Sequence, residues 1–143
     1  MEEIKKCSVL LIEDNDDHAE LIDFYINEVC QETVETKRLP DGEQAMGFIQ
    51  GFHVSDTPPD LILLDLKLPK YDGHEVLKAF KKNEILRSVP IIIFTTSNSR
   101  KDINMAYKNG ANSYILKPIE AGKIRETVEK IFDYWSMNEK GGK

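Results

Sequence analysis

Five short runs rich in aliphatic and β-branched residues alternate along the chain with stretches whose apolar residues recur at helical spacing. Three of these runs are apolar nearly throughout, as expected of strands buried on both faces of a parallel sheet. Each run is followed by a helical pattern, so the sequence predicts an α/β fold with five β-α units. Right-handed crossovers then give a doubly wound, flavodoxin-like, five-stranded parallel sheet with helices on both faces. The predicted strands cover residues 7–13, 35–39, 61–65, 90–96 and 113–117.

The size and charge of the chain limit its domain count and its partners. At 143 residues it has the length of one ordinary domain, so we expect a single domain over 1–143, with a core from about 7 to 135 and a flexible tail over 136–143. Only eight residues follow Trp135, so no output domain is expected. The formal net charge of −6 disfavours direct binding to nucleic acid or to an anionic membrane.

Targeting and redox features are also missing from the sequence. No apolar run approaches the ~20 residues of a spanning helix, and the first residues lack the pattern of a secretory signal. We therefore expect a cytoplasmic protein. Cys7 and Cys30 lack a CxxC spacing, which argues against a zinc site and against a disulfide framework.

Polar residues stand where the apolar runs end. Glu13 and Asp14 follow the first run, Asp65 ends the third, Thr95 lies at the end of the fourth and Lys117 ends the fifth. The carboxyl ends of strands in an open parallel sheet meet at one edge, where ligands bind. Clustered carboxylates repel one another, and a hard divalent cation such as Mg²⁺ relieves the repulsion. A carboxylate nucleophile, a metal and a lysine are the parts needed for phosphoryl transfer, although the acidic run 14–17, taken alone, is better explained as a helix cap than as a metal site.

Four motifs on four strands resemble the receiver domain of bacterial two-component response regulators. The motifs are "LLIEDN", "LILLDLKLPKYDG", "IIIFTTS" and "YILKP", in the order of that family, and the similarity extends from about residue 7 to 135. Thr95 follows Asp65 by 30 residues and Lys117 follows it by 52, which are the family's spacings. The resemblance implies a phosphorelay response regulator.

The resemblance assigns the acidic residues to phosphorylation and metal binding. Asp65 is similar to the family's phosphoacceptor, which takes a phosphoryl group from a histidine kinase. Glu13 and Asp14 are similar to the acidic pair that holds Mg²⁺ together with Asp65. The backbone carbonyl of Lys67 would complete the protein ligands of the metal.

The resemblance assigns the remaining motif residues to binding of the phosphoryl group and to the conformational change that follows. Thr95 and Lys117 would contact phosphoryl oxygens, and Tyr114 matches the aromatic switch position. Thr95 and Tyr114 are expected to point outward without phosphate and to move inward with it, changing a surface made by the fourth helix, fifth strand and fifth helix. In this family the bond between Lys117 and Pro118 is cis, and a cis bond costs little before proline.

Two positions modulate the phosphoryl lifetime in this family, and they correspond to Lys67 and Ser97. Neither is an acid or amide that readily orients an attacking water, so we expect slow self-dephosphorylation. Three histidines, His18, His53 and His74, are expected at exposed positions without a role.

The finer resemblance is to the small regulators that serve bacterial and cyanobacterial phytochrome kinases. The sequence "EDNDDHAELI", the connection 51–60 and the terminal "IFDYW" carry it. The partner is then a sensor histidine kinase, such as a bacterial phytochrome. Part of the aromatic end is expected to be exposed, with a homodimer through the fourth-helix to fifth-helix face as one interpretation and core packing with a frayed Trp135 as the other.

Three other functions fit parts of the pattern. A Mg²⁺-dependent phosphatase with an aspartate nucleophile commonly has a second aspartate two residues on, where this chain has Lys67. A phosphorylation-independent pseudo-receiver would not need the complete set of motif residues. A flavin carrier would want a glycine- and hydroxyl-rich loop after the first strand, where this chain has "EDNDD".

Overall fold

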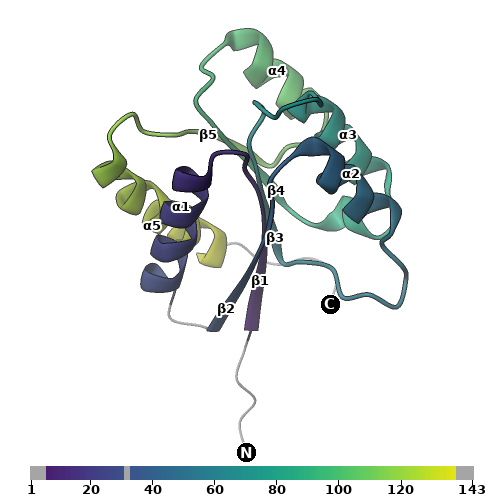
Figure 1. Ribbon diagram of the computed structural model, residues 1–143, viewed down its shortest axis with the longest axis horizontal. Coiled ribbons are helices and arrows are strands. Elements are labelled where there is room, and N and C mark those ends of the chain that lie inside the picture. The colour runs from purple at the N-terminus through teal and green to yellow at the C-terminus, as the bar shows by residue number, and fades with distance from the viewer. Residues whose placement is uncertain (1–5, 31–32, 138–143) are drawn as a thin grey trace, which may run out of the picture.

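The computed structural model describes residues 6–30 and 33–137 and contains one five-stranded parallel sheet in the order β2-β1-β3-β4-β5 (Figure 1). Each strand lies within two residues of its predicted bounds, and the predicted fold class is confirmed. The strands are β1 (Lys6–Ile12), β2 (Thr33–Leu39), β3 (Leu61–Leu64), β4 (Ile91–Thr95) and β5 (Ser113–Leu116). The helices are α1 (Asp16–Val29), α2 (Gly42–Gln50), α3 (Gly73–Lys82), α4 (Arg100–Lys108) and α5 (Ile124–Met137), with short 3-10 turns at Leu86–Ser88 and Ala121–Lys123.

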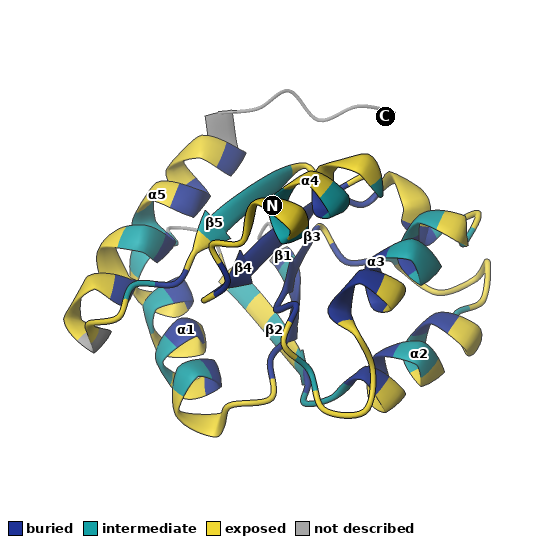
Figure 2. Ribbon diagram, turned by 90° about the horizontal axis from the view of Figure 1, so that it is seen from above, coloured by how far each residue is buried: buried dark blue, intermediate teal, exposed yellow. Residues whose placement is uncertain are grey.

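Helices cover both faces of the sheet (Figures 1 and 2). Helices α1 and α5 pack on one face, and α2, α3 and α4 on the other, so the apolar residues form two cores. Every residue of β3 and β4 is buried, whereas β2 alternates between exposed and half-buried residues for most of its length. The apolar strands therefore occupy the centre of the sheet, and the more polar β2 forms an edge.

Local signals in the sequence set the ends of the helices. The side chains of Asn15, Asp41, Asp72 and Ser99 each accept a hydrogen bond from a backbone N–H in the first turn of the helix that follows. Gly110 follows α4 with a φ of 101°, a left-handed conformation that glycine adopts without steric cost. These caps start the helices directly after the loops at the carboxyl ends of the strands.

The aromatic residues of α5 divide between core and surface. The rings of Phe132 and Trp135 are buried and meet edge to face with centroids 5.8 Å apart. Tyr134 is 57% exposed. The expected exposure of part of this segment is confirmed for Tyr134, but a frayed Trp135 is not observed. Helix α5 runs to Met137, so Ser136 and Met137, which were assigned to the predicted tail, are helical; the rest of that prediction, residues 138–143, lies outside the described part of the chain.

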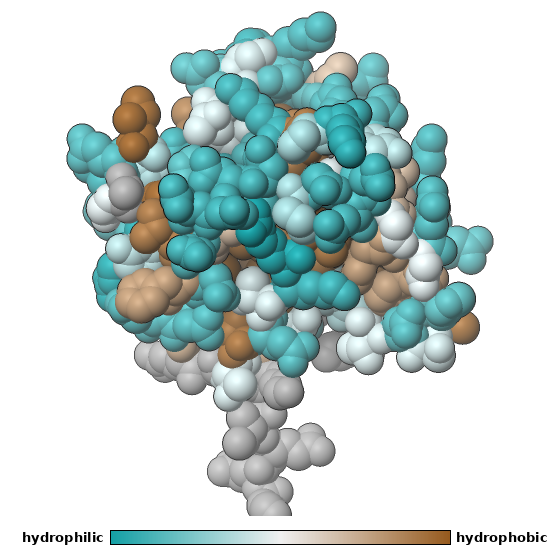
Figure 3. Space-filling model, viewed as in Figure 1, coloured by the Kyte–Doolittle hydropathy of each residue, from teal (hydrophilic) through white to brown (hydrophobic). Residues whose placement is uncertain are grey.

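The surface in the view of Figure 3 is mostly hydrophilic, with hydrophobic residues in small separate patches. Within residues 6–30 and 33–137, no helix combines the length and the apolar character that a membrane span requires.

Candidate functional site

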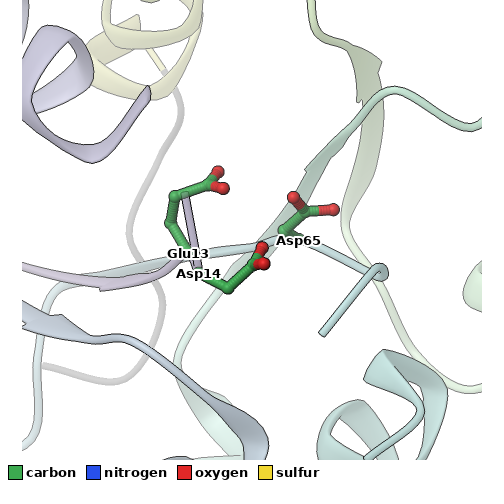
Figure 4. A group of neighbouring side chains, drawn as sticks. All are labelled: Glu13, Asp14 and Asp65. Atoms are coloured by element: carbon green, nitrogen blue, oxygen red, sulfur yellow. The ribbon is translucent and has the colours of Figure 1, made fainter. Parts of the chain in front are cut away.

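Three carboxylates meet at the carboxyl ends of β1 and β3. Ile12 and Leu64 are paired in neighbouring strands, and the backbone N–H of Asp65 donates to the carbonyl of Ile12 at 3.0 Å, so the residues that follow the two strands lie side by side. Ligand oxygens of Glu13, Asp14 and Asp65 all lie within 4.8 Å of one another (Figure 4). Glu13 and Asp65 are buried, and Asp14 is exposed. This donor set of carboxylate oxygens, open on one side, suits a hard divalent cation.

Lys117 compensates part of this negative charge. Its ammonium is buried and forms ion pairs with the Glu13 carboxylate and, at 2.8 Å, with Oδ2 of Asp65. Burial raises the pKa of Glu13, and the attraction of Lys117 opposes that rise without cancelling it. The third neighbour of the ammonium is Nδ1 of His18, at 3.4 Å.

Thr95 already faces Asp65 in this structure. The Thr95 hydroxyl is fully buried and donates to Oδ1 of Asp65 at 2.7 Å, and the backbone N–H of Lys67 donates to the same oxygen at 3.0 Å. The prediction that Thr95 points outward without phosphate is therefore wrong for this structure. The reason is that the Asp65 carboxylate itself is an acceptor within reach of the hydroxyl.

Tyr114 is also held inward rather than free. Its hydroxyl donates to the backbone carbonyl of Ser97 at 2.8 Å, and partial burial raises the pKa of the phenol. Ser97 is buried, and its hydroxyl donates to Oδ2 of Asp102 on α4 at 2.6 Å. The expected outward position of Tyr114 is not observed, because the loop after β4 offers a carbonyl acceptor for the phenol.

The bond between Lys117 and Pro118 is trans, since the described residues contain no cis peptide bond. The cis assignment is thus incorrect for this structure. Trans is the preferred isomer before proline by about 0.5–1 kcal/mol, and Lys117 reaches both carboxylates with the trans bond.

The histidines differ from the expectation of three exposed side chains. His53 is exposed as predicted, but His18 is half-buried beside Lys117, and His74 is 4% exposed. His74 precedes Leu77 by three residues and therefore lies on the buried face of α3. The helical period of "GHEVLKAF" was the signal that places this histidine inside.

Sequence reasoning also missed Arg38 at the end of β2. Its Nε donates to the backbone carbonyl of Glu13 at 3.0 Å, and its Nη1 pairs with Oδ1 of Asp16 at 2.7 Å. The guanidinium therefore ties the loop that carries Glu13 and Asp14 to the neighbouring strand. A basic residue at the end of a strand beside an acidic loop was the available signal.

The response regulator receiver domain family matches residues 9–129, and the chain belongs to this family. Receiver domains accept phosphoryl groups from histidine kinases, and the family consists of signalling proteins that act in phosphorelays.

Alignments with two relatives extend over most of the chain. The probable methanogenesis regulatory protein FilR2 of Methanothrix harundinacea is 42% identical over 129 residues, which cover 89% of this chain and 82% of that protein. The response regulator Rcp1 of Synechocystis is 34% identical over 136 residues, covering 89% of this chain and 87% of Rcp1.

Solved structures agree with the fold over the same range. The Mn²⁺-bound form of Rcp1 superposes with a TM-score of 0.85 at 31% identity, covering 95% of this chain and 99% of that one. The phosphorylated cyanobacterial phytochrome response regulator RcpA also gives 0.85, at 32% identity, covering 93% and 96%. The predicted resemblance to phytochrome-associated response regulators is thus confirmed.

Proposed function

We propose that Asp65 accepts a phosphoryl group from a phosphohistidine of a sensor histidine kinase. A bond forms between a carboxylate oxygen of Asp65 and phosphorus while the bond from phosphorus to the imidazole nitrogen breaks, and the electron pair of that bond returns to the imidazole. The observation that carries this assignment is the setting of the carboxylate. It is buried between the Lys117 ammonium and the Thr95 hydroxyl and lies beside two further carboxylates.

Glu13, Asp14 and Asp65, with the backbone carbonyl of Lys67, are proposed to hold Mg²⁺. When bound, the cation neutralises the carboxylates and the oxygens of the incoming phosphoryl group. The oxygen donors and the exposed side at Asp14 support the proposal, and the relative Rcp1 has been solved with Mn²⁺. A divalent cation that binds without the Asp14 carboxylate as tightly as with it would contradict this ligand set.

Thr95 and Lys117 are proposed to contact phosphoryl oxygens, since both already contact the carboxylate that would carry them. Tyr114 would report the change to the surface of α4, β5 and α5. That surface exposes Tyr107, Leu116 and Ile119, with Ile119 extending fully into solvent. Such exposed apolar side chains suit a protein partner or a homodimer across this surface, and sedimentation of phosphorylated and unphosphorylated protein tests the homodimer.

Lys67 and Ser97 are proposed to allow only slow loss of the phosphoryl group. Lys67 is an exposed cation, and the hydroxyl proton of Ser97 is engaged by Asp102, so neither offers a base to an attacking water. A half-life of seconds for the labelled protein would contradict this proposal.

A sensor histidine kinase is the proposed partner, and a bacterial phytochrome is the proposed kinase, on the similarity to Rcp1 and RcpA. FilR2 carries the name of a different regulatory system. Phosphotransfer from a purified phytochrome kinase, compared with a kinase that has another sensor module, tests the choice of partner. A cytoplasmic location is part of the proposal, and the acidic net charge supports a protein that binds neither nucleic acid nor an anionic membrane directly.

The decisive experiment is the intact mass of the protein after incubation with acetyl phosphate and Mg²⁺. We expect the mass of one phosphoryl group on the wild type, and its loss with a chelator or with Asp65→Asn. Asp17→Asn is the matched control, because Asp17 is an exposed aspartate of the same acidic run. Absence of the label with every phosphodonor would favour a pseudo-receiver, and continuous release of phosphate without a stable label would favour a phosphatase.

A further inference from the structure

A buried histidine joins α3 to α4 beside the proposed phosphorylation site. His74 lies in the first turn of α3, and its Nε2 donates to Oδ1 of Asp102 in the first turn of α4 at 3.0 Å. The histidine side chain is 5% exposed and that of Asp102 is 33% exposed. Nδ1 of His74 is buried and has no hydrogen-bond partner among the described residues. The histidine therefore makes its one side-chain hydrogen bond across the two helices.

The position of His74 is fixed relative to Asp65 through the backbone. The N–H of Gly73 donates to the carbonyl of Leu66, the residue after Asp65, at 3.1 Å. A Cβ atom on Gly73 would lie 2.4 Å from the Cα of Leu66, so the start of α3 packs directly on the chain that leaves β3. The Asp72 side chain accepts from the N–H of His74 at 3.0 Å. His74 thus lies in a helix end that packs on the segment directly after β3, next to Asp65.

Asp102 connects His74 to the loop after β4 by hydrogen bonds. Its Oδ1 accepts from His74, and its Oδ2 accepts the hydroxyl of Ser97 at 2.6 Å. Both hydrogen bonds lower the pKa of Asp102, and the one from Ser97 lowers it most. Asp102 therefore stays an anion and a strong hydrogen-bond acceptor. The N–H of Asp102 in turn donates to the Ser99 side chain at 3.2 Å.

These contacts fix the direction of the hydroxyl of Ser97, which follows Thr95 by two residues. A serine hydroxyl has a single proton to donate, and in this structure the proton goes to Asp102. The hydroxyl is therefore directed to α4 and not to a group on Asp65 or to a water beside it.

We propose that His74 and Asp102 are a positioning pair that holds the Ser97 hydroxyl against α4 and thereby prolongs the life of the phosphoryl group on Asp65. The proposal rests on the phosphorylation of Asp65 proposed above. Its new content is that residues on α3 and α4, which do not contact Asp65, set the rate at which the phosphoryl group is lost. Release of the hydroxyl from Asp102 lets its oxygen turn and accept a hydrogen bond from an attacking water, which orients that water toward phosphorus. Loss of one hydrogen bond of ordinary strength corresponds to about a fivefold change in rate.

The test is the decay of phosphorylated protein, prepared with acetyl phosphate and Mg²⁺ and followed by intact mass after removal of the donor. We expect Asp102→Ala to shorten the half-life about fivefold. His74→Leu shortens it in the same direction, whereas His74→Gln, whose amide nitrogen can donate to Asp102, retains most of the wild-type half-life. Asn104→Ala, at an exposed position of α4, is the matched control and leaves the half-life unchanged.

A second pair of variants separates positioning from general loosening of α4. In the Ser97→Ala background, Asp102→Ala has no further effect on the decay if Asp102 acts through the Ser97 hydroxyl. Equal shortening in the presence and absence of that hydroxyl would overturn the proposal, as would an unchanged half-life in Asp102→Ala. Asp102 is partly exposed, so the Asp102 variants are expected to fold. The test of the proposal therefore stands on the Asp102 and Ser97 variants even if the variants of the buried His74 do not fold. If the wild type takes no label, the phosphorylation of Asp65 is refuted. If it takes a label whose half-life is the same in Asp102→Ala, only the positioning role of Asp102 is refuted.

Discussion

Asp14→Asn is expected to stabilise the metal-free protein and to remove most of its stabilisation by Mg²⁺. Asp14 is the exposed member of the three carboxylates, whose ligand oxygens lie within 4.8 Å of one another. Glu13 and Asp65 together carry two negative charges, and Lys117, which pairs with both, carries one positive charge. Asp14 therefore experiences the repulsion of about one net negative charge.

The magnitude follows from Coulomb's law. One pair of like charges at this separation repels by about 0.9 kcal/mol in water and by about 3.5 kcal/mol at an effective dielectric of 20. Because Asp14 is exposed, the lower value applies, and the distance is shorter than the ~10 Å over which 0.1 M salt screens charges. We expect the free energy of unfolding to rise by about 1 kcal/mol, or roughly 2–4 °C in melting temperature.

The assay is urea unfolding in EDTA and across a Mg²⁺ titration, with Glu20→Gln as the matched control. Glu20 is an exposed acid on α1, so its change removes the same charge at a distance from the cluster. Wild type at a Mg²⁺ concentration 100 times the dissociation constant gains about 2.7 kcal/mol, whereas Asp14→Asn gains little. The reasoning fails if Asp14→Asn is no more stable than Glu20→Gln in EDTA, or if Mg²⁺ stabilises both variants equally.

Three further predictions concern the supporting structure. Gly73→Ala places a Cβ 2.4 Å from the Cα of Leu66, so urea unfolding should show a loss of about 1–3 kcal/mol, and a loss below 0.5 kcal/mol would contradict the close approach. Burial lowers the pKa of Lys81 from 10.5, so the folded state binds this proton less tightly than the unfolded state does. The stability of wild type relative to Lys81→Met should therefore rise with pH from the lowered pKa toward 10.5, and parallel pH profiles of the two proteins would refute this. Tyr114→Phe removes the hydrogen bond to Ser97 and should cost about 1 kcal/mol in thermal unfolding, with an unchanged melting temperature as the contrary result.

The fold was predictable because its signals are local and repeated. The apolar runs predicted β1, β3 and β4; every residue of β3 and β4 is buried, as are Cys7 and residues 9–12 of β1. The end of each run placed a polar residue at the edge of the sheet. Strand β2 was predicted two residues short, since Thr33 and Val34 precede an alternating polar segment that carries little apolar signal. Edge strands with one exposed face show this weakness in general.

The candidate site was predictable in its residues but not in its hydrogen bonds. Asp65, Thr95 and Lys117 meet as their spacing indicated, yet the inward position of Thr95 depends on one 2.7 Å contact that no sequence pattern specifies. His74 was misplaced for a different reason. It was weighed as a single polar residue, whereas its position on the apolar stripe of α3 determines that it is buried.

The charges of the site give both Lys117 and the proposed divalent cation a part in neutralising it. The three carboxylates and Lys117 leave two net negative charges at the edge of the sheet, the amount that a divalent cation neutralises. A phosphoryl group on Asp65 replaces one negative charge by up to two. In the proposed phosphorylated state Lys117 would turn from the carboxylates to a phosphoryl oxygen, because no other cation among the described residues forms an ion pair with Asp65. We propose that this movement would loosen the ion pair between Lys117 and Glu13. Glu13→Gln should therefore speed labelling of Asp65 at a saturating concentration of Mg²⁺, as measured by the initial rate of mass gain. An initial rate at saturating Mg²⁺ no faster than that of the wild type would show that Glu13 acts only as a metal ligand.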